Sequence, residues 1–229
     1  MPEPELRAVL FDMDGTLLDS ERLWEVGLRD LAGELGRTLD PATRARLVGM
    51  DQTESVEVLH SEWGLPHDTV PANTRWLIER MKVLFAAGMT WRPGAADLLA
   101  DVRRSGIPAA LVTATGRELV DIIIGTIGAS NFTVTVCGDE VARNKPDPEP
   151  YATAYRALGL DPGDCLAIED SVTGVASASA AGVPVLAVPS EVSIPARPGV
   201  AVSESLRGVD VAALRRAHAG LMTRESPIG

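Results

Sequence analysis

Short apolar runs alternate with longer amphipathic segments over most of the chain, and this pattern predicts an α/β fold. Each predicted strand is a short, mainly apolar run bounded by polar or turn residues. These runs are residues 6–11, 108–113, 132–137, 164–168, 183–188 and 200–202. Apolar runs separated by helices are typical of parallel strands that are buried on both faces. We therefore predict a parallel sheet with helices on both sides.

The segments between these strands have apolar residues at helical spacing, and several end at glycine. The predicted helices are residues 95–105, 117–127, 148–158, 172–181 and 209–219. Ser171 is a suitable N-cap for the helix that follows it, and Gly182 is a suitable stop. Residues 223–229 are expected to fray.

Residues 17–91 break the alternation because they contain helical patterns and no strand. The four helices predicted here are residues 17–36, 40–48, 53–63 and 70–87. They follow the first strand and precede all the others, so they form an insertion after strand one. We predict a core made of residues 1–16 and 92–229, with a helical cap of residues 17–91. The four tryptophans, expected mainly to pack, lie in the cap or at its edge: Trp24, Trp63, Trp76 and Trp91.

The charge balance limits the possible partners. The 229 residues include 21 basic and 32 acidic ones, a net charge of −11, which argues against nucleic acid or an anionic membrane as the main partner. No apolar run is long enough to span a bilayer, and residues 1–5 lack the features of a signal peptide. Cys137 and Cys165 match no metal-binding spacing and are expected to be buried thiols. We expect a cytoplasmic protein that is a monomer or a weak homodimer.

Two carboxylates follow the first strand directly, in Asp12-Met13-Asp14-Gly15-Thr16. Like charges this close repel each other unless a cation or a substrate lies between them. An ordinary acidic turn is the alternative interpretation, since Asp and Gly are common turn residues.

Other polar residues follow three further strands, and parallel strands bring their carboxyl ends to one edge of a sheet. These residues are Thr113, Lys145 with Pro146, and Glu169 with Asp170. The carboxylates could supply oxygen ligands for Mg²⁺, and the lysine could supply a cation for phosphate oxygens. This combination suits phosphoryl transfer. Each residue also has a local alternative: Thr113 as a helix cap, Lys145 as a solvated lysine, Glu169-Asp170 as a turn. His60, His67 and His218 show no ligand spacing and are expected to be surface or helix residues.

With these four motifs in order, the chain resembles the haloacid dehalogenase-like hydrolase superfamily over nearly its whole length. In detail it is similar to the group with a helical cap inserted after strand one, which contains small-molecule phosphatases and β-phosphoglucomutase. The resemblance implies a Rossmann-like parallel sheet flanked by helices, usually with strand order 5-4-1-2-3.

The resemblance also implies residue roles. Asp12 would attack phosphorus and form an aspartyl-phosphate, and Asp14 would act as acid and then base. Thr113 would hydrogen-bond the phosphoryl group, and Lys145 would neutralise charge on Asp12 and the phosphate. The resemblance implies four Mg²⁺ ligands, with Glu169 binding directly or through water: Asp12, Asp14 through its carbonyl, Glu169 and Asp170.

The choice among activities rests on a few positions. Asp14 and the metal carboxylates disfavour a dehalogenase, while Thr16, Trp24 and Gln52 depart from the β-phosphoglucomutase-like pattern. We predict a Mg²⁺-dependent phosphatase of a small phosphorylated metabolite, such as a sugar or polyol phosphate. A phosphomutase and a non-catalytic phosphometabolite-binding protein remain the alternatives. Candidate substrate-binding residues are Thr16, Ser20, Trp24, Gly49, Gln52, Arg80, Ala114 and Thr115. Cap closure would exclude water, with hinges near residues 17–20 and 88–93.

Overall fold

The computed structural model describes residues 5–190, 193–195 and 197–224, and these residues contain one parallel sheet. Its strand order is β3-β2-β1-β4-β5-β6. The strands are β1 (Ala8–Phe11), β2 (Ala109–Val112), β3 (Val134–Val136), β4 (Cys165–Glu169), β5 (Val185–Ala187) and β6 (Val200–Val202). The predicted sheet and its order are therefore confirmed, and β6 extends the sheet beyond β5.

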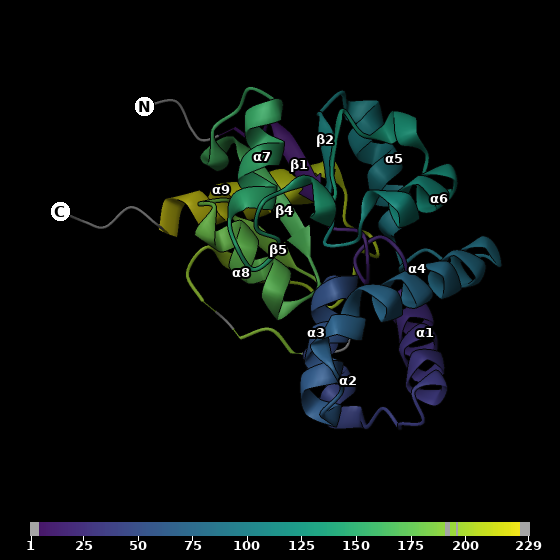
Figure 1. Cartoon of the computed structure of the whole chain (residues 1–229). Helices are drawn as coiled ribbons and strands as arrows, with labels where there is room; N and C mark the ends of the chain where they lie inside the picture. Colours follow the sequence, from purple (N-terminus) through teal and green to yellow (C-terminus); the bar gives the residue numbers. More distant parts are fainter. Residues whose placement is uncertain (1–4, 191–192, 196, 225–229) are drawn as a thin grey trace.

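Helices cover both faces of the sheet because side chains alternate between the faces along each strand. Val9 and Phe11 face a core shared with α5 (Ala95–Ser105), α6 (Arg117–Ile127) and α9 (Val211–Arg224). Ala8 and Leu10 belong to the opposite core, which contains α7 (Glu149–Ala157) and α8 (Val172–Ala180). Figure 1 shows these two helical layers on either side of the strands. Short 3-10 helices cover His67–Thr69, Ala129–Asn131, Gly138–Glu140 and Pro162–Asp164.

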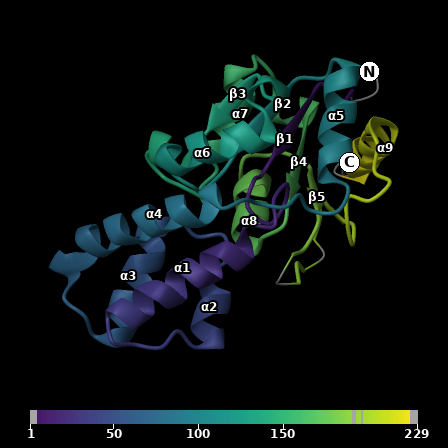
Figure 2. The ribbon, with the colours of Figure 1, turned by 90° about the vertical axis from the view of Figure 1, so that its right-hand side faces the viewer.

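The inserted segment forms four helices that lie together beyond the sheet (Figures 1 and 2). We call them the helical block: α1 (Glu21–Glu34), α2 (Pro41–Leu47), α3 (Gln52–Trp63) and α4 (Val70–Ala86). The Asp40 and Asp51 side chains cap α2 and α3 by accepting backbone N–H bonds. The chain leaves β1 at its carboxyl end, so the block lies over the edge where the polar strand ends converge.

The first helix of the block starts later than predicted. The spacing of apolar residues favours a start at Leu17, but α1 begins at Glu21. Residues 17–20 instead pair with the returning chain: the Asp19 N–H donates to the Thr90 carbonyl at 2.9 Å, and the Arg92 N–H donates to the Leu17 carbonyl at 2.8 Å. These long-range bonds hold the two connections of the block side by side.

The remaining differences concern chain ends and histidines. Helix α9 continues to Arg224, five residues beyond its predicted end at residue 219, and most of the segment predicted to fray lies outside the described residues, as do residues 1–4. His60 and His218 lie in helices as expected but are fully buried, while His67 is exposed.

None of the described helices is both long enough and apolar enough to cross a membrane.

Candidate active site

Asp12 and Lys145 form a buried ion pair at the carboxyl edge of the sheet. Asp12 follows β1 directly, and its Oδ1 accepts a 2.8 Å hydrogen bond from Lys145 Nζ. The same ammonium donates to the Val112 carbonyl at 2.9 Å and to Glu169 Oε1 at 2.7 Å. The second oxygen of Asp12, Oδ2, is buried and has no hydrogen-bond partner among the described residues. One carboxylate oxygen is thus held in place while the other remains available for chemistry.

Glu169, which does not line the cavity itself, accepts a hydrogen bond from Lys145. Its Oε1 also accepts a 2.7 Å hydrogen bond from the Tyr151 hydroxyl, and its Oε2 accepts from the Asp170 N–H and the Ser171 hydroxyl at 3.2 and 3.3 Å. Both oxygens of this fully buried carboxylate are therefore engaged by protein donors. The structure favours a positioning role for Glu169.

Clustering of these acids changes their proton affinities. In the absence of a metal, burial and the neighbouring Glu169 raise the pKa of Asp12 to about 8, although Lys145 opposes the shift. Burial, followed by the charges of Asp12 and Glu169, raises the pKa of Asp170 well above its ordinary value. Burial lowers the pKa of Lys145, but the two adjacent carboxylates outweigh it, and the net pKa lies above the ordinary value. With all three carboxyl groups ionised, the cluster would carry more negative charge than one ammonium can balance.

A divalent metal fits this cluster. One oxygen from each of Asp12, Glu169 and Asp170 lies within 4.8 Å of the others, and all three residues are buried. Hard carboxylate oxygens are the ligands that Mg²⁺ prefers. Gly15 makes room for the Asp170 carboxylate, because a Cβ at this position would lie 2.0 Å from Asp170 Oδ2. Its φ of +77° also favours glycine. The Ser190 hydroxyl donates to the same Asp170 oxygen.

Asp14 has a different environment, formed by hydroxyl and indole donors. Its Oδ1 accepts from the Ser20 hydroxyl at 2.6 Å and from Trp24 Nε1 at 3.1 Å. Its Oδ2 accepts from the Thr115 hydroxyl at 2.7 Å and from the Thr113 hydroxyl at 3.2 Å. Asp14 is partly exposed to the cavity and has no cation bonded to it among the described residues. These contacts orient a carboxyl group that can exchange a proton with a bound molecule.

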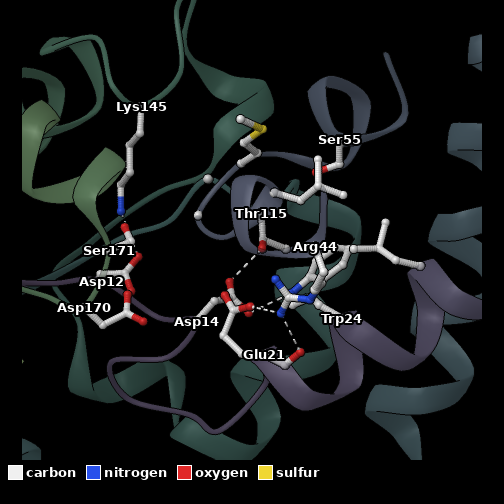
Figure 3. A pocket seen from close by; sticks show the side chains of 15 residues that line it. Asp12, Asp14, Glu21, Trp24, Arg44, Ser55, Thr115, Lys145, Asp170 and Ser171 are labelled. Carbon is white, nitrogen blue, oxygen red and sulfur yellow. Dashed lines mark hydrogen bonds and ion pairs between the residues drawn. The ribbon is translucent and has the colours of Figure 1, made fainter. Parts of the chain in front are cut away.

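The cavity over these residues lies between the sheet edge and the helical block (Figure 3). Its lining from the core is Asp12, Asp14, Ala114, Thr115, Lys145, Asp170 and Ser171. Its lining from the helical block and the connection after α2 is Glu21, Trp24, Leu28, Arg44, Leu47, Gly49, Met50 and Ser55. The free space is about 30 Å³, close to the volume of one water molecule. The structure therefore shows the block closed over the site.

Several predicted site residues do not line the cavity. Arg80 forms a 2.7 Å ion pair with Asp30 within the helical block. Gln52 lies against Gly116, where a Cβ would come within 2.8 Å of Gln52 Nε2. Thr16 is buried, and Ser20 and Thr113 contribute only through Asp14. Of the proposed substrate contacts, the structure brings Trp24, Gly49, Ala114 and Thr115 to the cavity.

Sequence reasoning missed two charged residues in the cavity wall, Glu21 and Arg44. Each lies on the buried face of its helix: Glu21 is three residues before Trp24, and Arg44 is three residues before Leu47. A charged residue at the apolar spacing of an amphipathic helix is the signal that identifies such positions.

Comparisons with known proteins agree with this geometry. The family model described as haloacid dehalogenase-like hydrolase matches residues 9–188. Protein CbbY of Rhodobacter capsulatus is 33% identical over 201 residues, which cover 82% of this chain and 87% of that protein. The phosphorylated carbohydrates phosphatase of Thermotoga maritima is 31% identical over 179 residues, covering 78% and 82%. A crystal structure of a CbbY mutant from Rhodobacter sphaeroides in complex with xylulose-(1,5)bisphosphate has a TM-score of 0.81 at 28% identity, covering 91% of this chain and 99% of that one.

Proposed function

This chain belongs to the haloacid dehalogenase-like hydrolases, and from that premise we propose that it is a Mg²⁺-dependent phosphatase of a small phosphorylated carbohydrate or polyol. The predicted hydrolase class is confirmed by the family match and by relatives that are phosphatases. The main support for the proposal is the environment of the Asp12 carboxylate. Its Oδ1 accepts a hydrogen bond from Lys145, and its Oδ2 has no hydrogen-bond partner among the described residues.

Asp12 supplies the nucleophile in this proposal. Its Oδ2 forms a bond to phosphorus while the ester P–O bond breaks, and Lys145 offsets negative charge on Asp12 and on the phosphoryl group. Asp14, oriented by Ser20, Trp24, Thr113 and Thr115, donates a proton to the departing oxygen. Asp14 then takes a proton from the water that attacks phosphorus, and the bond between Asp12 and phosphorus breaks.

Asp12 and Asp170 would hold Mg²⁺, with Glu169 nearby. The bound ion would neutralise the acidic cluster and polarise the phosphoryl oxygens. The predicted contribution of the Asp14 carbonyl stays a prediction.

The helical block is proposed to act as a cap, with the division at residues 17 and 91 and hinges in the paired connections. A closed cavity with room for about one water excludes bulk solvent during phosphoryl transfer. Opening of the cap would admit the substrate and later water.

We also place the protein in the cytoplasm. Cys137 and Cys165 are buried free thiols, and burial raises the pKa of each to about 12. Such unreactive thiols agree with a reducing compartment.

The direct test compares wild type with Asp12→Asn by phosphate release from an aryl phosphate, with Mg²⁺ and with a chelator. We expect the variant to lose at least about 10³-fold in kcat, because an amide is a poor nucleophile. The chelator should abolish wild-type turnover. Asp121→Asn, an exposed change on α6, is the matched control and should retain activity. Unchanged turnover by Asp12→Asn would rule out the mechanism, and absence of turnover by wild type would favour a non-catalytic binding protein.

A further inference from the structure

A hydroxyl group from the segment after β5 contacts the acidic cluster of Asp12, Glu169 and Asp170. The Ser190 hydroxyl donates a hydrogen bond to Asp170 Oδ2. The sheet brings the two residues together, because β5 pairs with β4 and the Val188 N–H donates to the Glu169 carbonyl at 2.7 Å. Asp170 follows β4 directly, and Ser190 comes two residues after Val188. Asp170 is only 2% exposed, so bulk water has little access to replace this donor.

Each carboxylate of the acidic cluster has at least one oxygen bonded to a donor of the protein. Asp12 Oδ1 accepts from Lys145, and both oxygens of Glu169 accept hydrogen bonds from described residues. Ser190 imposes the same condition on Asp170. Among the hydrogen bonds between described residues, none reaches Asp170 Oδ1. Within the part of the chain that the structure describes, Asp170 therefore offers one oxygen to a cation, and no carboxylate of the cluster offers two.

The number of free carboxylate oxygens matters for the choice between Mg²⁺ and Ca²⁺. Ca²⁺ takes about six to eight oxygen ligands and can bind both oxygens of one carboxylate. Mg²⁺ is smaller, requires near-octahedral geometry and usually keeps several waters beside one or two carboxylates. A cluster in which each carboxylate offers at most one oxygen therefore suits Mg²⁺ better than Ca²⁺.

We propose that Ser190 is a positioning residue for the metal, because its hydrogen bond limits Asp170 to one metal-binding oxygen and thereby favours Mg²⁺ over Ca²⁺. This inference rests on the proposed Mg²⁺-dependent function. The hydroxyl also restricts rotation of the Asp170 carboxylate, so the ligand oxygen is oriented before an ion binds. Gly15 leaves space for this arrangement, since a Cβ there would lie 3.0 Å from Ser190 Oγ and 2.0 Å from Asp170 Oδ2.

The test measures the dissociation constants of Mg²⁺ and Ca²⁺ by calorimetry on the metal-free chain, without substrate. The preference is the dissociation constant of Ca²⁺ divided by that of Mg²⁺. Both ions would compete with protons for the same carboxylates, so this ratio largely cancels the effect of that competition. We expect wild type to bind Mg²⁺ more tightly than Ca²⁺.

Ser190→Ala frees Asp170 Oδ2, so the preference for Mg²⁺ should fall at least about tenfold. Ser190→Thr keeps a hydroxyl donor and should retain most of the preference. The matched control is Ser203→Ala, which removes a hydroxyl that donates to the Ser205 carbonyl at 2.9 Å, just after β6 and outside the acidic cluster. It should keep the wild-type preference. A general loss of structure would weaken the binding of both ions, so a changed preference is specific to the way Asp170 binds the ion.

The outcomes separate the inference from the function on which it rests. Absence of Mg²⁺ binding, or of aryl phosphate turnover, by wild type would contradict the proposed function. Normal turnover and Mg²⁺ binding with equal or tighter binding of Ca²⁺ would overturn the inference, as would a Ser190→Ala preference equal to that of wild type. The wild-type comparison needs no variant, so it can overturn the inference even where Ser190→Ala does not fold.

Discussion

At the scale of single residues, Asp12 would link the stability of the protein to the proposed Mg²⁺. Burial and Glu169 raise the pKa of Asp12 from 3.8 to about 8 in the metal-free site. A carboxyl group with a higher pKa in the folded chain binds more protons there than in the unfolded chain. The metal-free protein should therefore gain stability from this group as the pH falls from about 8 toward 3.8. Protons and the proposed Mg²⁺ would compete for the same oxygens.

This competition gives a measurable prediction for thermal unfolding. At about pH 8 and a free Mg²⁺ concentration of about 100 Kd, binding should add about 2.7 kcal/mol and raise Tm by roughly 5–10 °C. At about pH 6 the same concentration should give a smaller rise, because Asp12 is mainly protonated. Asp170→Asn should lose most of the rise at both pH values. Equal rises for wild type at the two pH values would contradict the assignment of Asp12 to the metal.

At the scale of elements, the close approach of α8 to the end of β4 positions Lys145. Gly174 lies in the first turn of α8, and a Cβ there would come within 1.9 Å of Glu169 Oε1. That oxygen accepts the hydrogen bond from Lys145. The absence of a side chain at Gly174 therefore lets Glu169 reach the ammonium that holds Asp12.

Gly174→Ala should impair both folding and turnover. Overpacking against Glu169 should cost about 1–3 kcal/mol, measured by urea unfolding. Displacement of Lys145 should lower kcat by roughly 10²-fold. Gly125→Ala is the matched control, since it lies on the exposed side of α6, where the added Cβ would meet no described atom within 4 Å apart from its chain neighbours and the backbone of its own helix. It should stabilise the protein by about 0.5–1 kcal/mol and leave kcat unchanged. Equal effects of the two substitutions would contradict this account of Gly174.

Elements differ in how well their boundaries follow from the sequence. Helices α5 and α6 match the prediction at both ends, since Gly94 and Gly106 flank α5 and Gly116 and Gly128 flank α6. The start of α1 could not be predicted, because Leu17 and Asp19 form backbone hydrogen bonds with Arg92 and Thr90, more than seventy positions away. Local periodicity carries no information about such pairing.

At the scale of the whole molecule, the two sides of the cavity also differ in how well the sequence predicts them. Polar residues after strands β1, β2 and β4 converge because parallel strands bring their carboxyl ends together, a rule that the sequence alone allows us to apply. The side formed by the helical block depends on how α1, α2 and α4 pack, and periodicity does not give that packing. Arg80 on α4 therefore pairs with Asp30 away from the cavity, whereas the unpredicted Arg44 on α2 lines it.

The closed arrangement of block and core leads to a last prediction, that substrate enters only when the two separate. A Cβ on Gly49 would lie 3.0 Å from the Cβ of Ser171, slightly less than the ~3.5–4.5 Å of a disulfide. A small shift would thus allow Gly49→Cys and Ser171→Cys together to form a crosslink between block and core. Cys137 and Cys165 are buried and should not interfere.

We expect the oxidised double variant to lose nearly all turnover of an aryl phosphate and to regain it on reduction, because a locked cavity of about 30 Å³ has no room for a substrate. Each single variant is a control for the local effect of its own substitution, including strain at Gly49, where φ is +77°. Activity of the single variants should not respond to reduction. Full activity in the oxidised double variant, with the crosslink verified by mass spectrometry, would show that substrate reaches Asp12 without separation of the helical block from the core.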